Sequence, residues 1–198
     1  MNTATKRSYA MGARAEAAAA TGERILDAAE ELFWSKPLDA ISLDEVAGRA
    51  GVTVQTVIRR FGGKEGVIAA AAERARERVS AQRATAPVGD VPGAVAVLVD
   101  HYEAVGDQAL RLLSDEDSSP ELKDMVEQGR ELHRQWCRRV FAPTLSGLSG
   151  VDHARREAQL VAACDVYTWK LLRRDAGLSR KQTELALTEL IEPLTKGR

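Results

Sequence analysis

The stretch ISLDEVAGRAGVTVQTVIRRFGGKEGV, from Ile41 to Val67, decides the fold. Within it, Ser42 precedes Glu45 by three residues, which is the spacing of a capping box. In that arrangement each side chain binds a backbone N–H of the other residue, so the first turn of a helix is stabilised. The spacing therefore predicts a short helix over about residues 43–50.

A second short helix is expected directly after a tight turn. Gly51 stands where the turn needs a positive φ, which glycine adopts at little cost. Thr53 is placed to cap a helix over about residues 54–60. Two short helices across a tight turn are typical of a helix-turn-helix, whose second helix has the size to enter the major groove of DNA.

The rest of the chain also has the apolar spacing of amphipathic helices. Six further segments repeat apolar residues every three or four positions, and no comparable stretch alternates with period two. Thr21 is placed to cap the first of these helices, and Ser119 and Ser179 to cap two later ones. Residues 84–93 contain two prolines and two glycines, and by composition they are the best domain boundary. The sequence predicts an all-α protein.

Composition narrows the function classes further. The 198 residues carry a net charge of −1 with 29% charged residues, which is typical of a globular domain. Residues 1–85 contain 13 basic and 11 acidic residues, an excess too small to predict nucleic-acid binding alone. No apolar run is long enough for a membrane span, and no secretory signal is expected. Two cysteines make no disulfide framework, so a reducing cytoplasm is the expected location.

The segment GERILDAAEELF, residues 22–33, followed by the helix-turn-helix motif, resembles the tetracycline-repressor (TetR) family of bacterial regulators. The resemblance covers about residues 21–70. It implies an all-helical dimer in which three N-terminal helices bind DNA and the rest binds a ligand and dimerises. Residues 1–20 are a lightly basic, alanine-rich arm, which we expect either to be flexible or to extend the first helix. On the family plan we expect a helix-turn-helix domain over 21–66 and a helical ligand-binding and dimerisation domain over 67–198.

The resemblance also implies which side chains meet double-stranded DNA. Hydroxyl groups near helix N-termini bind phosphate oxygens in this family, together with a lysine that opens the next helix. These phosphate contacts correspond here to Ser42, Thr53, Thr56 and Lys64, with Arg60 as a further one. In the arm, Lys6, Arg7 and Arg14 are candidates for backbone or minor-groove contacts. Taken singly, the hydroxyl residues could instead be plain helix caps.

The side chains expected to face the groove are Val54, Gln55 and Arg59. Gln55 can read adenine and Arg59 can read guanine, each by a pair of hydrogen bonds. The family usually has an aromatic residue where this chain has Ile58, and often a polar one where it has Val54. Gly62 and Gly63 replace a more usual proline and serine before Lys64. These departures put the operator sequence in doubt and leave the fold prediction intact.

The C-terminal part offers weaker candidates. Aromatic and apolar side chains there can line a ligand pocket or form ordinary core. Those candidates are Tyr102, His133, Trp136, Cys137, Phe141, Tyr167 and Trp169. His133 and Cys137 are four residues apart, but two ligands do not make a zinc site, so no metal and no cofactor are expected. The last two helices resemble the pair through which many family members dimerise, with Leu187, Leu190 and Leu194 on one seam. The same seam could instead pack within one subunit, and the dimer is favoured because a palindromic operator needs two recognition helices.

The function predicted from these features is a homodimeric regulator, and a repressor released from a palindromic operator by an unknown small-molecule effector. The alternative is a helical ligand-binding or interaction protein that has kept a vestigial helix-turn-helix. An enzyme is not expected, because no nucleophile–base arrangement or carboxylate pair stands out in the sequence.

Overall fold

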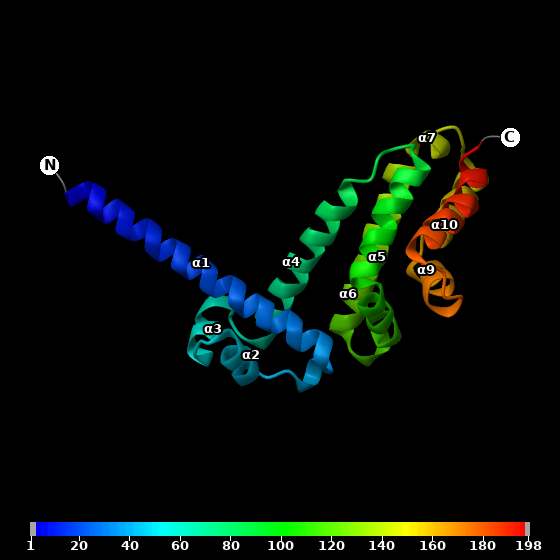
Figure 1. Cartoon of the computed structure of the whole chain (residues 1–198). Coiled ribbons are helices and arrows are strands. Elements are labelled where there is room, and N and C mark those ends of the chain that lie inside the picture. Colours follow the sequence, from blue (N-terminus) through cyan, green and yellow to red (C-terminus); the bar gives the residue numbers. More distant parts are fainter. Residues whose placement is uncertain (1–2, 197–198) are drawn as a thin grey trace. The chain divides into compact units, whose positions relative to one another are not determined.

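The computed structural model describes residues 3–196, and over that range the chain is helical with no strand (Figure 1). This confirms the all-α prediction. The chain divides into two compact units, residues 1–75 and 76–198. Side chains are described from residue 12 onward, except those of residues 13 and 14, so the predictions for Lys6, Arg7 and Arg14 lie outside the described side chains.

The N-terminal unit consists of three helices and the first half of a fourth. They are α1 (Thr3–Ser35), α2 (Leu43–Ala50), α3 (Val54–Phe61) and α4 (Lys64–Ala84), with a short 3₁₀ turn at Leu38–Ala40. α2 packs against α1, and α3 packs against α2. The apolar stripes meet in a core of buried side chains: Ile25, Ala29, Leu32, Val46, Ala47, Val57, Val67 and Ala71.

Thr21 does not begin a helix as predicted. It lies inside α1, and its hydroxyl donates to the Ala17 carbonyl at 2.8 Å, four residues back along the same helix. The preceding residues AEAAAA, 15–20, are strong helix formers, so the helix continues through a residue type that often caps. The helix propensity of the preceding alanines therefore outweighs the capping tendency of Thr21.

Arg74 of α4 ties that helix to α1 by three ion pairs. Its guanidinium nitrogens lie 2.7 Å from the carboxylate of Glu30 and 2.8 Å from those of Glu23 and Asp27. The three acidic residues are spaced along one face of α1, so one cation neutralises a row of like charges. This contact fixes the start of α4, and with it Lys64, within the N-terminal unit.

The C-terminal unit is built from the remaining helices. They are α5 (Val91–Ser114), α6 (Pro120–Val140), α7 (Ala142–Leu145), α8 (Gly150–Ala163), α9 (Val166–Lys170), which continues as a π-helical turn over Leu171–Asp175, and α10 (Arg180–Thr195). α5 packs against α9 and α10, and α6 packs against α8. Their buried faces share one core, whose members include Leu98, Tyr102, Trp136, Val140, Leu160, Trp169, Leu187 and Ile191.

The predicted caps of this unit are confirmed. The Ser119 hydroxyl accepts from the Leu122 N–H ahead of Pro120, and Ser179 forms a capping box with Gln182. No helix among residues 3–196 combines the length and apolar character needed to cross a bilayer.

Candidate nucleic-acid interface and C-terminal site

The capping box that begins α2 is present as predicted. The Ser42 hydroxyl accepts from the Glu45 N–H at 3.3 Å, and the Glu45 carboxylate accepts from the Ser42 N–H at 3.1 Å. The Lys36 ammonium binds the same carboxylate. The Lys36 hydrogen bond, followed by those from Ser42, lowers the pKa of Glu45 to about 2. The carboxylate therefore stays ionised and keeps the start of α2 in place.

The turn between α2 and α3 brings two hydroxyl groups to the beginning of α3. Gly51 has φ +65°, the conformation predicted for the turn. The Thr53 hydroxyl accepts from the Thr56 N–H at 3.3 Å, and the two threonine hydroxyls lie 3.0 Å apart. Hydroxyls beside free N–H groups at the positive end of a helix dipole are suited to a phosphate.

One face of α3 packs against the core, and the other is exposed to solvent. Val57 is fully buried in the core, whereas Gln55, Arg59 and Arg60 are exposed. Ile58 is also 39% exposed. Val54 is only half-buried. The exposed face of α3 thus has two long polar side chains, Gln55 and Arg59, and the apolar Ile58.

A shallow groove runs between α1 and α3. The residues that line it are Ala18, Thr21, Val52, Thr53, Thr56, Arg59 and Arg60. The Arg60 guanidinium packs so closely on α1 that a Cβ atom at Gly22 would lie 2.3 Å from one of its nitrogens. The structure therefore brings four of the predicted DNA-binding residues to one concave surface. The contribution of α1 was missed, because only the continuation of this helix through Thr21 places it there.

Lys64 is the first residue of α4 and is held by an earlier turn. Its ammonium donates to the Asp39 carbonyl at 3.0 Å, three residues before Ser42. The side chain is half-buried. The predicted phosphate ligands Ser42 and Lys64 are thus linked through one short segment of chain.

In the C-terminal unit, six of the seven predicted pocket residues are packed in the interior. Tyr102, His133, Trp136, Cys137, Phe141 and Trp169 are all buried. The Tyr102 hydroxyl donates to the Cys164 carbonyl at 2.9 Å, and the Trp136 indole N–H donates to the Arg83 carbonyl at 2.9 Å. These residues are core in this structure, and a role in contacting an effector stays a prediction.

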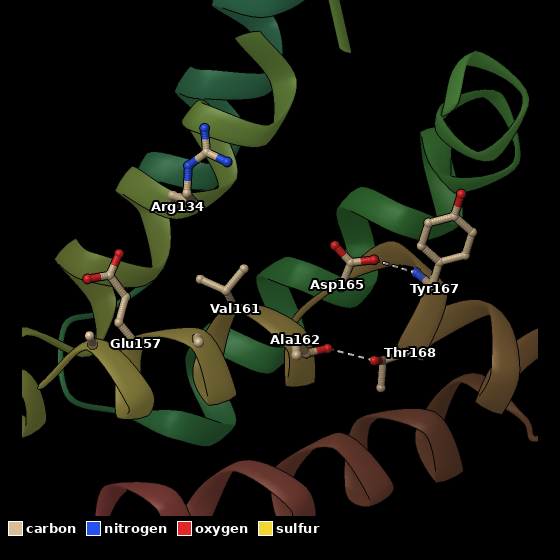
Figure 2. Close-up of a pocket in the computed structure, with 9 residues that line it drawn as sticks. Arg134, Glu157, Val161, Ala162, Asp165, Tyr167 and Thr168 are labelled. Atoms are coloured by element: carbon tan, nitrogen blue, oxygen red, sulfur yellow. Dashed lines mark hydrogen bonds between the residues drawn. The ribbon is translucent and has the colours of Figure 1, made fainter. Parts of the chain in front are cut away.

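An open groove of about 740 Å³ lies nearby, between α6, α8 and α9 (Figure 2). Arg134 and Glu157 flank one part, and Asp165 and the half-exposed Tyr167 the other. The Asp165 carboxylate accepts from the Tyr167 N–H at 2.9 Å. Of the seven predicted pocket residues, Tyr167 lines this groove and the other six do not. Its lining residues come from three separate helices and their connections, so no sequence motif marks it.

The three leucines predicted to form the dimer seam of α10 differ in burial. Leu187 is fully buried within the subunit, Leu194 is half-buried, and Leu190 is 50% exposed. Of the three, Leu190 is the one available to a partner. Val151 at the start of α8 is 79% exposed and Leu185 of α10 is 58% exposed, so both helices also carry apolar surface outside the core.

Comparison with known proteins supports the assignment of the N-terminal unit. Residues 25–71 match the model of the family described as bacterial regulatory proteins, tetR family. A TetR/AcrR-family transcriptional regulator from Thermobifida fusca superposes with a TM-score of 0.56 at 25% identity, over 89% of this chain and 98% of that one. No curated protein sequence matches the chain.

Two further solved structures share the fold across both units. A transcriptional regulator from Rhodococcus sp. has a TM-score of 0.63 and 23% identity, over 87% of this chain and 95% of that one. The regulator FadR from Bacillus subtilis, solved with stearoyl-CoA, has a TM-score of 0.59 and 17% identity, over 89% of this chain and 98% of that one. Residues 25–71 thus match the helix-turn-helix domain of the tetR family of bacterial regulatory proteins, and the rest of the chain shares the fold of solved transcriptional regulators.

Proposed function

We propose that this protein is a sequence-specific, DNA-binding transcription regulator. The observation that carries the proposal is the surface of α3, where Thr53, Thr56, Arg59 and Arg60 line one groove beside exposed Gln55. The residue types suit the task, because hydroxyls and arginines bind phosphates while glutamine and arginine read base edges. α3 enters the major groove, and backbone contacts supply much of the affinity and its dependence on salt.

The regulator acts as a homodimer on a palindromic operator. A single short recognition helix reads only a few base pairs, and a two-fold dimer presents two such helices to two half-sites. The exposed apolar residues Val151, Leu185 and Leu190 favour α8 and α10 as the helices that meet their two-fold mates. A protein of this kind works in the cytoplasm, at the nucleoid.

A small-molecule effector releases the protein from DNA, which makes it a repressor. Release requires that the effector bind the state unable to dock more tightly than the state that docks. α4 gives a physical link for such coupling, because it begins with Lys64 in the N-terminal unit and ends with Ala84 in the C-terminal unit. The structure of the similar regulator FadR in complex with stearoyl-CoA supports a ligand with a long acyl chain for this fold.

The alternative is a ligand-binding or interaction protein whose helix-turn-helix no longer binds DNA. The apolar Val54 and Ile58 on the reading helix favour it, and the intact pairing of Thr53 with Thr56 speaks against it.

The deciding experiment is selection of genomic DNA fragments on the purified protein at near-physiological salt, followed by sequencing. We expect a recovered palindrome with two half-sites, and a strong loss of binding in an Arg59→Ala, Lys64→Ala double variant that keeps its helical circular dichroism. A wild-type protein that enriches no sequence over bulk DNA, with or without small-molecule extracts present, would establish the alternative.

A further inference from the structure

Arg83, near the end of α4, is a buried cation without an acidic partner among the residues that the structure describes. It is 5% exposed, the one buried side chain with a fixed charge over that range. One terminal nitrogen lies 3.0 Å from His133 Nδ1, and the guanidinium stacks on the Trp136 ring at 4.5 Å. Its Nε–H is buried and has no hydrogen-bond partner. Burying a charge is costly unless it is paired, so this arrangement is incomplete.

A second arginine shows what the completed arrangement looks like. Arg174 stacks on Trp169 at the same 4.5 Å, but its guanidinium also binds the Asp107 carboxylate at 2.9 Å. Arg174 is exposed, where a partner is needed less. The arginine with the greater need for a counter-ion is the one that lacks it.

The two histidines and the tyrosine near Arg83 do not supply that charge. Because arginine only donates, His133 Nδ1 must accept, so the ring is neutral and its Nε2–H points to the Val161 carbonyl at 3.2 Å. Burial, followed by the charge of Arg83, lowers the pKa of His101 to about 3. Burial raises the pKa of Tyr102, which keeps its hydroxyl protonated.

We propose that Arg83 anchors the anionic group of a small organic effector, a monocarboxylate with an apolar body. The carboxylate takes the place of His133 Nδ1 and engages the free Nε–H, because a charge-assisted pair is stronger than a hydrogen bond to a neutral ring. An apolar body suits the surroundings, which are the indole of Trp136, the phenol of Tyr102 and the core around them.

The groove of Figure 2 gives the route to this site. Val161 lines the groove, and its carbonyl is the group that His133 binds on the side away from Arg83. One imidazole ring therefore separates the guanidinium from the groove wall. Rotation of His133 exposes Arg83 to a ligand that enters there.

Release of DNA by this ligand rests on the proposed function, whereas binding of the anion does not. Arg83 is the last residue but one of α4, and Lys64 is the first. A ligand that moves the end of α4 therefore acts on the same helix that carries a predicted phosphate contact.

The test compares octanoate with 1-octanol, a neutral analogue of the same length, by titration calorimetry and tryptophan fluorescence. We expect wild type to prefer octanoate at least tenfold. Arg83→Met should lower the octanoate affinity about 10- to 100-fold, as for the loss of a charge-assisted hydrogen bond, and leave octanol unchanged. Arg174→Met, which also unstacks an arginine from a tryptophan, is the matched control and should bind octanoate as wild type does.

Two outcomes would contradict the proposal that Arg83 binds a carboxylate. One is equal affinity of wild type for octanoate and octanol, and the other is undiminished octanoate binding by Arg83→Met. Thermal melting adds a readout that does not depend on the ligand. Because methionine removes the unpaired charge and keeps the stacking length, the Arg83→Met protein should be at least as stable as wild type, and a marked fall in Tm would assign Arg83 a structural role instead.

Cys137 is the remaining candidate for a counter-ion. A hydrogen bond with Cys164 lowers the pKa of the Cys137 thiol, and the same pairing raises that of Cys164. A thiolate at neutral pH is detected by its ultraviolet absorbance. If wild type shows a thiolate band that is lost in both Cys137→Ser and Arg83→Met, Arg83 already has its anion and the proposal fails. Absence of that band supports it.

Measurements of DNA binding distinguish failure of the proposed anion site from failure of the proposed function. On a fragment recovered by selection, octanoate should weaken binding by wild type and not by Arg83→Met, while both bind equally without it. If neither protein binds DNA, the proposed function fails and the calorimetry still decides the anion site. If both proteins bind DNA and octanoate weakens the binding of both equally, Arg83 is not the anion site, and the proposed function as a DNA-binding regulator is retained.

Discussion

The ammonium group of Lys64 donates to the Asp39 carbonyl at 3.0 Å, so the first residue of α4 is held by the turn that precedes α2. An ammonium has three N–H donors, and this contact uses one. The side chain is therefore oriented in advance, with donors left for a phosphate. Less side-chain entropy is lost on binding than for a freely rotating lysine.

Replacing Lys64 by methionine should weaken DNA binding by a similar factor for every sequence, because a phosphate contact has no base preference. It should also lower the slope of log K against log salt by about one, since one fewer counter-ion is released. Binding titrations at several salt concentrations measure both effects. Lys123→Met, at an exposed position on α6, is the control. An unchanged slope would remove Lys64 from the interface.

Glu45 should make the stability of the N-terminal unit depend on acid pH. Its pKa is about 2 in the folded protein against an ordinary 4.5, so its contribution is complete above pH 4.5 and is lost as the pH falls toward 2. Glu45→Gln retains an acceptor for the capping box but cannot ionise. The difference in unfolding free energy between wild type and this variant should therefore shrink from pH 5 to pH 2.

Urea unfolding across that pH range measures the difference, with Glu77→Gln, an exposed position in α4, as the control. A difference that stays constant with pH would show that the Glu45 carboxylate is not selectively stabilised in the folded state.

The parts of the fold that the sequence predicted depend on interactions between near neighbours. Ser42 stands three residues before Glu45, and Thr53 directly precedes its helix, so both caps are visible in the sequence and are found in the structure. The prediction that Thr21 caps a helix was wrong, also because of an interaction between near neighbours. Its hydroxyl donates to a carbonyl four residues back, inside a helix that the preceding alanines favour.

The parts that could not be predicted depend on contacts between distant segments. Arg83 and His133 are 50 residues apart, and nothing in the sequence shows that this arginine is buried when others are exposed. Leu187 and Leu190 share one predicted stripe, yet only packing against α5 and α8 determines that the first is core and the second surface. The helical spacing of apolar residues shows which face of a helix is apolar. It does not show which other helix packs against that face.

Gly66 should be required by close packing at the start of α4. A Cβ atom there would lie 1.7 Å from the Phe61 carbonyl oxygen, which is backbone and cannot rotate away. Gly66→Ala should destabilise the N-terminal unit by roughly 1–3 kcal/mol, as overpacking does. Gly48→Ala in α2 is the matched control, because a Cβ there meets nothing within 4 Å and alanine should stabilise that helix by up to ~1 kcal/mol. Urea unfolding that shows equal effects for the two would contradict the packing argument.

Leu190 should be needed for the proposed dimer. It is half-exposed on α10, so Leu190→Glu places a charge on the surface without entering the core. We expect a monomer in light scattering coupled to size exclusion, and a loss of operator affinity because only one half-site is then held. Val88→Glu changes a residue equally exposed in the loop before α5 and should leave the dimer intact. A dimeric Leu190→Glu protein would move the interface elsewhere.

Ile58 should read thymine. It is 39% exposed on α3 next to Arg59, and an apolar side chain in the major groove recognises the thymine 5-methyl group. Replacing operator thymines one at a time by uracil removes that methyl group and nothing else. Wild type should lose about fourfold in affinity at one position per half-site, the factor expected for about 0.8 kcal/mol per buried methyl-sized group.

The Ile58→Ala protein should be insensitive to uracil at that position, whereas Gln55→Ala should bind more weakly overall and keep the uracil effect. This pairing of a side-chain deletion with a base-methyl deletion isolates one contact, since other losses cancel between the two operators. If Ile58→Ala keeps the uracil profile of wild type, Ile58 does not face the bases. The apolar side of α3 would then count in favour of the ligand-binding alternative, because nothing in the DNA would account for it.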